Sequence, residues 1–167
     1  MKNRHLKELA ELGWMNVEHF ISMPDGNGKW IFGDGTYALR MNGEPVVKEG
    51  NADILLPMIR EIDKLANSKY KKPITLPSIG YLKRKNRAKL DYRIPIKLPG
   101  HEIFVNSKLL YEMLKVLHNA EGYSVEMRGF NGKSKVDTTA IYLKADNGDG
   151  VLCPLKMYTR RVDNAPD

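Results

Sequence analysis

Apolar residues recur at helical spacing in three segments of the chain. The first segment covers residues 2–13, where charged residues occupy the faces outside the apolar stripe. The second runs from about 53 to 67, with Asp53 as its expected N-cap. The third is the clearest, because a leucine-rich stripe extends over residues 107–118 behind a cap at Asn106 or at the serine that follows it. The pattern therefore predicts three helices.

Short stretches of alternating apolar and polar residues predict β-strands around these helices. Residues 24–28 and 146–150 have the glycine and asparagine content of tight hairpin turns, and Asn42-Gly43 marks another turn. The predicted strands cover residues 15–21, 30–32, 36–41, 123–130, 136–144 and 150–157.

The same order of elements, a helix followed by antiparallel strands, occurs twice along the chain. The first unit covers about 1–48 and the second about 101–158, and the second predicted helix and a basic insert fill residues 49–100 between them. Helices packed on an antiparallel sheet define an α+β fold. We expect a single domain over residues 1–158, followed by a flexible polar tail at 159–167.

The positive charge of the chain is concentrated in one segment. The 167 residues include 27 Lys and Arg against 20 Asp and Glu, a formal net charge of +7. Residues 69–97 contain ten basic residues and one acidic residue, Asp91, so this segment carries +9 and the rest of the chain −2. Such a segment attracts polyanions and can neutralise phosphates. The alternative interpretation is a solvated basic loop that only aids solubility.

Aromatic residues interleave with these charges. Tyr70, Tyr81 and Tyr92 would be able to stack on exposed bases. Four prolines between residues 73 and 99 exclude one continuous helix, so we expect short strands or extended loops near residues 74–76 and 92–98. The candidate DNA contacts in this segment are Lys71, Lys72, Lys83, Arg84, Lys85, Arg87 and Lys89.

The residue types that commonly catalyse reactions or bind metals are not grouped in the sequence. The four histidines are scattered, none has a metal-ligand spacing, and no glycine-rich phosphate-binding loop occurs. Residues 146–150 do not continue into the pattern of a calcium loop. We therefore expect no enzyme activity, no metal and no cofactor.

Cellular location is indicated by hydropathy and by cysteine usage. No apolar run approaches the roughly 20 residues of a transmembrane helix, and the N-terminal residues lack the apolar core of a signal peptide. The only cysteine, Cys153, excludes an internal disulfide, and we expect it to be a buried, unreactive thiol. These features predict a cytoplasmic protein that does not enter a membrane.

Several short motifs occur in the order found in one known family. Residues 105–110, Val-Asn-Ser-Lys-Leu-Leu, open the leucine-striped helix, and residues 125–127, Val-Glu-Met, follow it. Residues 149–157 end the series with Asp-Gly-Val-Leu and Pro-Leu-Lys-Met, and residues 33–40, Gly-Asp-Gly-Thr-Tyr-Ala-Leu-Arg, precede it. From residue 103 to 157 the chain resembles the closing half of a domain of the bacterial sliding clamp, the β subunit of DNA polymerase III. Residues 33–40 resemble part of its opening half.

This resemblance implies a mechanism. Clamp domains form a ring with their helices toward duplex DNA and their sheets outside, and they hold phosphates without reading bases. The helices predicted at 2–13 and 107–118 would then face DNA through Arg4, Lys7, Lys108 and Lys115. For these four residues the alternative is an ordinary solvated helix face. The peptide-binding pocket of the family would include Pro154, Leu155, Lys156 and Met157, for which the alternative is a last core strand.

Two functional hypotheses follow. The first is a sliding-clamp-like processivity or accessory protein of replication or repair, which binds duplex DNA without sequence preference and forms homo-oligomers. The alternative is a clamp-like protein-interaction module of a phage or mobile element. Such a module would be an adaptor or inhibitor that binds a polymerase, a clamp, another replication protein or a host factor without touching DNA. Steep salt dependence favours the first hypothesis, and salt-tolerant partner binding favours the second.

Overall fold

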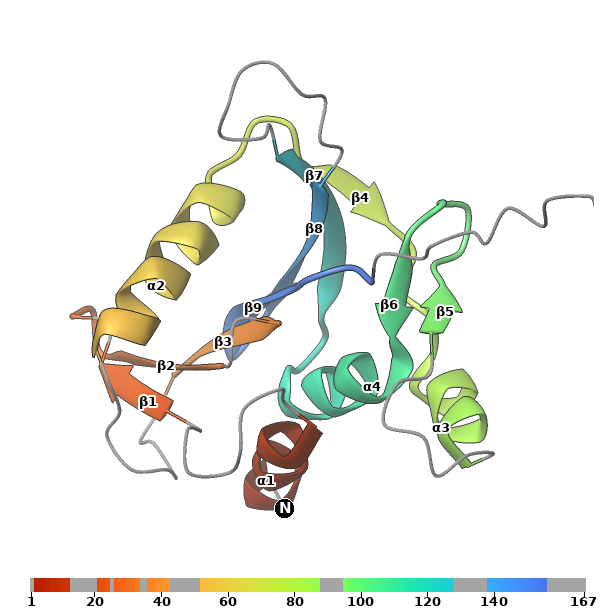
Figure 1. Ribbon diagram of the computed structural model, residues 1–167, viewed down its shortest axis with the longest axis horizontal. Helices are drawn as coiled ribbons and strands as arrows, with labels where there is room; N and C mark the ends of the chain where they lie inside the picture. The colour runs from red at the N-terminus through yellow and green to blue at the C-terminus, as the bar shows by residue number, and fades with distance from the viewer. Residues whose placement is uncertain are drawn as a thin grey trace, which may run out of the picture.

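The chain forms four helices and nine strands within the residues that the computed structural model describes, namely 2–12, 21–24, 26–33, 36–42, 52–87, 95–127 and 138–155 (Figure 1). The helices are α1 (Lys2–Leu12), α2 (Ala52–Ala66), α3 (Ile79–Arg87) and α4 (Ser107–Val116). The strands are β1 (Ile21–Pro24), β2 (Lys29–Gly33), β3 (Tyr37–Asn42), β4 (Lys72–Ile74), β5 (Pro95–Lys97), β6 (Phe104–Asn106), β7 (Glu121–Met127), β8 (Thr138–Ala145) and β9 (Gly148–Leu152). The predicted α+β class is confirmed.

Seven of the strands form one sheet, in the order β1-β2-β3-β9-β8-β7-β4, and every neighbouring pair in it is antiparallel. Two three-stranded meanders, β1-β2-β3 and β7-β8-β9, meet at the centre, where the final strand of one pairs with the final strand of the other. In each meander the first strand lies outermost and the third strand lies at the centre of the sheet. The element order that repeats in the sequence therefore produces two topologically equivalent meanders, and β4 adds a seventh strand next to β7.

The helices cover both faces of this sheet, because side chains alternate between the faces along each strand. Tyr37, Leu39 and Met41 of β3 belong to the larger core, which also contains buried residues of α1, α3 and α4. Ala38 lies in the smaller core beneath α2, on the opposite face. Figure 1 shows α2 on one side of the sheet and the other three helices on the other side.

Helix α4 packs on the sheet from a capped N-terminus, and the side chain of Met113 in its middle reaches β9. The side chain of Asn106 accepts hydrogen bonds from the backbone N–H groups of Lys108 (3.0 Å) and Leu109 (3.4 Å), which confirms the predicted cap. The helix ends at Val116, two residues earlier than expected. A Cβ atom added at Gly150 would lie 2.7 Å from the Cδ2 atom of Leu39 and 3.2 Å from the Cε atom of Met113, so the absent side chain leaves room for Leu39 of β3 and for Met113 of α4.

The basic segment contains a helix that the sequence pattern did not predict. Ser78 caps α3, because its Oγ atom accepts a hydrogen bond from the backbone N–H of Tyr81 at 3.1 Å. Leu82 is the only fully buried residue of this helix. A helix with one buried residue has no apolar stripe, so periodicity could not reveal it.

Other boundaries also differ from the predictions. Helix α2 begins at Ala52, so Asp53 lies in its first turn and not at the cap. Strand β9 ends at Leu152, which leaves the predicted strand residues 153–155 outside any strand. Cys153 is exposed, so the expectation of a buried thiol is wrong. The strand predicted at 15–21 lies outside the described residues except for Ile21, where β1 begins.

None of the helices within the described residues is long and apolar enough to cross a membrane.

Candidate nucleic-acid interface

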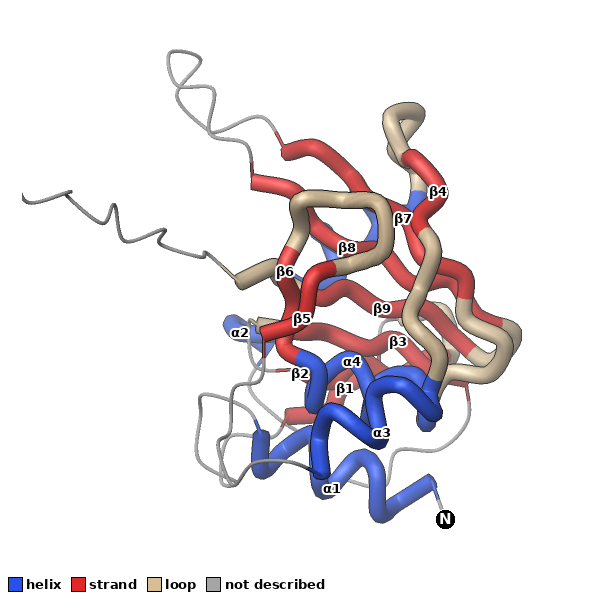
Figure 2. The backbone as a smooth tube through the Cα atoms, turned by 90° about the vertical axis from the view of Figure 1, so that its right-hand side faces the viewer, coloured by secondary structure: helices blue, strands red, loops and turns tan. Residues whose placement is uncertain are grey.

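Three helices, α1, α4 and α3, form a layer on one face of the sheet, with α4 in the middle (Figures 1 and 2). On one flank of α4, Glu112 is hydrogen-bonded to His5 of α1. On the other flank, the Ser107 hydroxyl donates a hydrogen bond to the side-chain oxygen of Asn86 of α3 at 2.5 Å. These two contacts fix the order of the helices. We call this arrangement the α1–α4–α3 layer.

The α1–α4–α3 layer is strongly basic. Its three helices contain nine Lys and Arg against three Asp and Glu, a net charge of +6. Helix α2, on the opposite face of the sheet, contains two basic and three acidic residues, a net charge of −1. The helices on the two faces of the sheet therefore differ in the sign of their net charge, and those of the α1–α4–α3 layer are the cationic ones.

Helix α3 contributes the densest part of this charge. Lys83, Arg84, Lys85 and Arg87 are all exposed, and the helix has no acidic residue. Leu82 and Asn86 occupy its inner side against α4, so the basic side chains lie on the remaining faces. Four predicted contacts thus lie on one short helix.

The four contacts implied by the family resemblance belong to the same layer. Lys108 and Lys115 lie seven residues apart on α4 and are half-buried. Arg4 and Lys7 of α1 are exposed. Arg4 forms a 3.9 Å ion pair with Glu8, and such an exposed pair holds its partners only weakly. The structure therefore brings these residues and the basic residues of α3 to one layer.

The remaining predicted DNA contacts lie elsewhere. The Lys71 ammonium donates a hydrogen bond to the Ala66 carbonyl oxygen at 2.6 Å and lies 5.4 Å from the ring centroids of both Tyr123 and Tyr142. These contacts hold it at the C-terminal end of α2, on the face opposite the α1–α4–α3 layer. Lys72 is exposed on the edge strand β4. Lys89 lies outside the described residues.

The predicted partner-binding residues are described only in part. Pro154 and Leu155 are half-buried, and the Leu155 N–H donates a hydrogen bond to the Phe104 carbonyl oxygen at 2.8 Å. The segment after β9 is therefore attached to β6. Lys156 and Met157 lie outside the described residues, so the peptide pocket stays a prediction.

The contact between His5 and Glu112 is a polar link between α1 and α4. Both side chains are largely shielded from solvent, and the His5 ring also packs edge-on against Tyr111 with centroids 6.5 Å apart. Burial raises the pKa of Glu112 above its ordinary value, and the hydrogen bond from His5 partly opposes this rise. The net effect is that the folded state holds the proton of Glu112 more tightly than the unfolded chain does.

We expect Glu112→Gln to make the protein more stable than the wild type at pH 7 but not at pH 4. A raised folded-state pKa means that the contribution of Glu112 to stability is greatest below the unfolded value of 4.5 and falls as the pH rises through the folded value. Glutamine cannot ionise, so the variant does not lose this stability as the pH rises. Urea unfolding midpoints of both proteins at the two pH values test this. Glu102→Gln, at an exposed carboxylate, is the control. An equal difference at both pH values would contradict the assignment.

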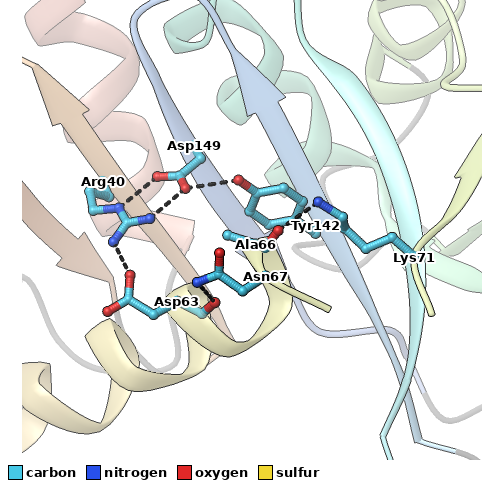
Figure 3. Close-up of polar contacts among 7 residues, drawn as sticks. All are labelled: Arg40, Asp63, Ala66, Asn67, Lys71, Tyr142 and Asp149. Atoms are coloured by element: carbon cyan, nitrogen blue, oxygen red, sulfur yellow. Dashed lines mark hydrogen bonds and ion pairs between the residues drawn. The ribbon is translucent and has the colours of Figure 1, made fainter. Parts of the chain in front are cut away.

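A buried polar cluster that the sequence did not predict lies on the other face of the sheet (Figure 3). Arg40 and Asp149 are directly opposite each other in β3 and β9, and the guanidinium donates two hydrogen bonds to the carboxylate, at 2.9 and 2.7 Å. The remaining Nη atom of Arg40 contacts Asp63 of α2. The Tyr142 hydroxyl of β8 donates to Asp149 at 2.9 Å.

This cluster is arranged for attachment of α2, not for proton transfer. The hydrogen bonds that Arg40 donates to Asp149 raise the pKa of Arg40 above its ordinary value, so the guanidinium stays charged. Burial is the main cause that raises the pKa of Tyr142, so its hydroxyl stays a neutral donor. Each side-chain nitrogen of Arg40 already has a carboxylate partner. Within the described ranges, no group of three or more His, Cys, Asp or Glu is placed to bind a metal ion.

In comparisons with known proteins, no family model matches the chain, and no curated protein and no solved structure matches it significantly. The fold and the surface define the class: an α+β protein with a basic three-helix layer on one face of an antiparallel sheet.

Proposed function

We propose that the protein is a sliding-clamp-like accessory factor of DNA replication or repair, which binds duplex DNA through the α1–α4–α3 layer without reading its sequence. The observation that carries the proposal is the charge difference between the two helical faces, +6 for this layer against −1 for α2. Phosphate binding depends on such cations and supplies most of the affinity of non-specific complexes.

The arrangement of the two repeated units supports the same proposal. Helix α1 opens the first unit and α4 lies near the start of the second, and the two helices pack side by side on the same face of the sheet (Figure 1). A pair of adjacent helices on one face of a continuous sheet is the surface that the sequence resemblance assigns to DNA. The basic helix α3 widens this surface on the side of α4 away from α1.

Fluorescence anisotropy with a labelled duplex at increasing salt concentration tests the proposal. We expect the logarithm of the association constant to fall linearly with the logarithm of the salt concentration, with a slope of about −0.9 for each phosphate neutralised. Duplexes of unrelated sequence should bind equally well. Absence of binding at low salt, or binding that does not respond to salt, would contradict the proposal.

The oligomeric state is a separate part of the proposal. A ring around DNA needs a closed assembly of several copies, and light scattering after size-exclusion chromatography measures its mass directly. A defined closed oligomer supports encirclement of DNA. A monomer at all concentrations would restrict the protein to one-sided contact with the duplex.

A further inference from the structure

An exposed aromatic ring lies among the cations of α3. Tyr81 keeps 37% of its surface exposed, and Ile79, two residues earlier, keeps 40%. The Lys85 ammonium lies 5.7 Å from the centroid of the Tyr81 ring, as expected for residues four apart on one side of a helix. The basic helix therefore presents an aromatic surface beside its charges.

Packing does not account for the position of this ring. The inner side of α3 is formed by Leu82, which is fully buried, and by Asn86, which is bonded to Ser107. Tyr81 belongs to neither hydrophobic core. The neighbouring Gly80 leaves the helix surface open, because a Cβ atom there would meet only the guanidinium of Arg84, at 3.9 Å. The exposed part of the Tyr81 side chain is therefore what a flat ligand can reach.

The combination of ring and cations selects a particular ligand. Binding the phosphates of duplex DNA requires only cations, and the bases of the duplex are stacked inside the double helix, where Tyr81 cannot reach them. An unpaired nucleotide instead offers both a flat base and a phosphate one sugar away, which match Tyr81 and Lys85. Aromatic side chains in basic grooves bind single strands in this way, with little sequence preference, because every base has a π-face.

We propose that α3 binds single-stranded DNA, with one base stacked on Tyr81 and the adjacent phosphates held by Lys85 and Arg84. The inference rests on the proposed function and deepens it, since it gives the α3 edge of the duplex-binding layer a second ligand, unpaired DNA, that uses the Tyr81 ring in addition to the cations. The other tyrosines of the basic segment are not part of this site. Tyr70 lies between α2 and β4, and Tyr92 lies outside the described residues.

The test compares two variants of the full chain on two DNA probes. Tyr81→Ala removes the ring, and Tyr81→Phe retains it without the hydroxyl group. Each protein is titrated with labelled oligo(dT) of about 16 nucleotides, a length that covers one typical single-strand site, and with a duplex. Tyr81→Ala should weaken oligo(dT) binding by about 5- to 150-fold, the range measured for loss of one stacked base. Tyr81→Phe should bind like the wild type, and duplex binding should not change in either variant.

The outcomes separate this inference from the proposed function. If the wild type binds duplex but not oligo(dT), or if Tyr81→Ala leaves oligo(dT) binding unchanged, the inference is wrong and the proposed function stands. If Tyr81→Ala lost equal affinity for oligo(dT) and for duplex, Tyr81 would be a general DNA contact, and the inference would again be wrong. If neither probe binds, both proposals fail. A Tyr81-dependent loss with oligo(U) but not with oligo(dT) would overturn the choice of DNA. Thermal unfolding of Tyr81→Ala confirms that the fold is retained.

Discussion

Neutralising the four basic residues of α3 together, as Lys83→Gln, Arg84→Gln, Lys85→Gln and Arg87→Gln, should reduce duplex DNA affinity by at least about 100-fold at low salt. The same change should lower the slope of the salt dependence by as much as about 4, because each lost phosphate contact removes about 0.9 from the slope. All four side chains are exposed and glutamine is a good helix former, so we expect the fold to persist. Anisotropy titrations over a range of salt concentrations measure both quantities.

A matched variant separates the position of these charges from their number. The quadruple change at Arg60, Lys64, Lys69 and Lys144 removes the same total charge from exposed positions outside the α1–α4–α3 layer. It should weaken binding only slightly, since charges far from the bound phosphates are screened by salt. If the two quadruple variants lose the same affinity, net charge and not the α1–α4–α3 layer is responsible for binding.

Removing one carboxylate of the buried cluster should have the largest effect on stability. Asp149→Ala would leave the buried guanidinium of Arg40 without its main partner, and breaking a buried ion pair from one side typically costs about 3–5 kcal/mol. The Tyr142 hydroxyl would lose its acceptor as well. Chemical denaturation of the variant and the wild type gives the difference in unfolding free energy.

Asp63→Ala is the matched control, because Asp63 contacts the same guanidinium from a more exposed position. The side chain of Asp63 is 53% exposed and that of Asp149 only 10%. An ion pair open to water contributes about 1 kcal/mol or less, so Asp63→Ala should be well tolerated. The double variant Arg40→Met with Asp149→Leu should regain most of the stability, since apolar replacement of a buried pair is often neutral. Equal losses for the two single variants would contradict the dependence on burial.

Local signals in the sequence predicted the elements better than their arrangement. The leucine stripe and Asn106 located α4 to within two residues, because both the apolar face and the cap are local features of the chain. The hairpin turn before β9 was found for the same reason. The central pairing of β3 with β9 could not be predicted, because no local pattern specifies which distant strands become neighbours.

In the candidate site, too, local features could be predicted from the sequence and long-range contacts could not. The basic segment was evident from composition alone, but α3 was missed because its single buried residue, Leu82, gives no periodic signal. The Arg40–Asp149 pair joins residues 109 positions apart, so only the register of the sheet brings them together. Conversely, Lys71 looked like a surface cation in the sequence and is engaged at the end of α2.

The β3–β9 junction also has a consequence during synthesis on the ribosome. Tyr37 pairs with Leu152, so 115 residues must be added after Tyr37 before its partner residue is in the chain. At a synthesis rate of about 5–20 residues per second, this interval is roughly 6–23 s. Throughout it, β3 exposes an unpaired backbone edge to other nascent chains, which is the kind of edge that promotes misassembly. The nascent protein is therefore expected to depend on chaperones that act early, before the sheet can close.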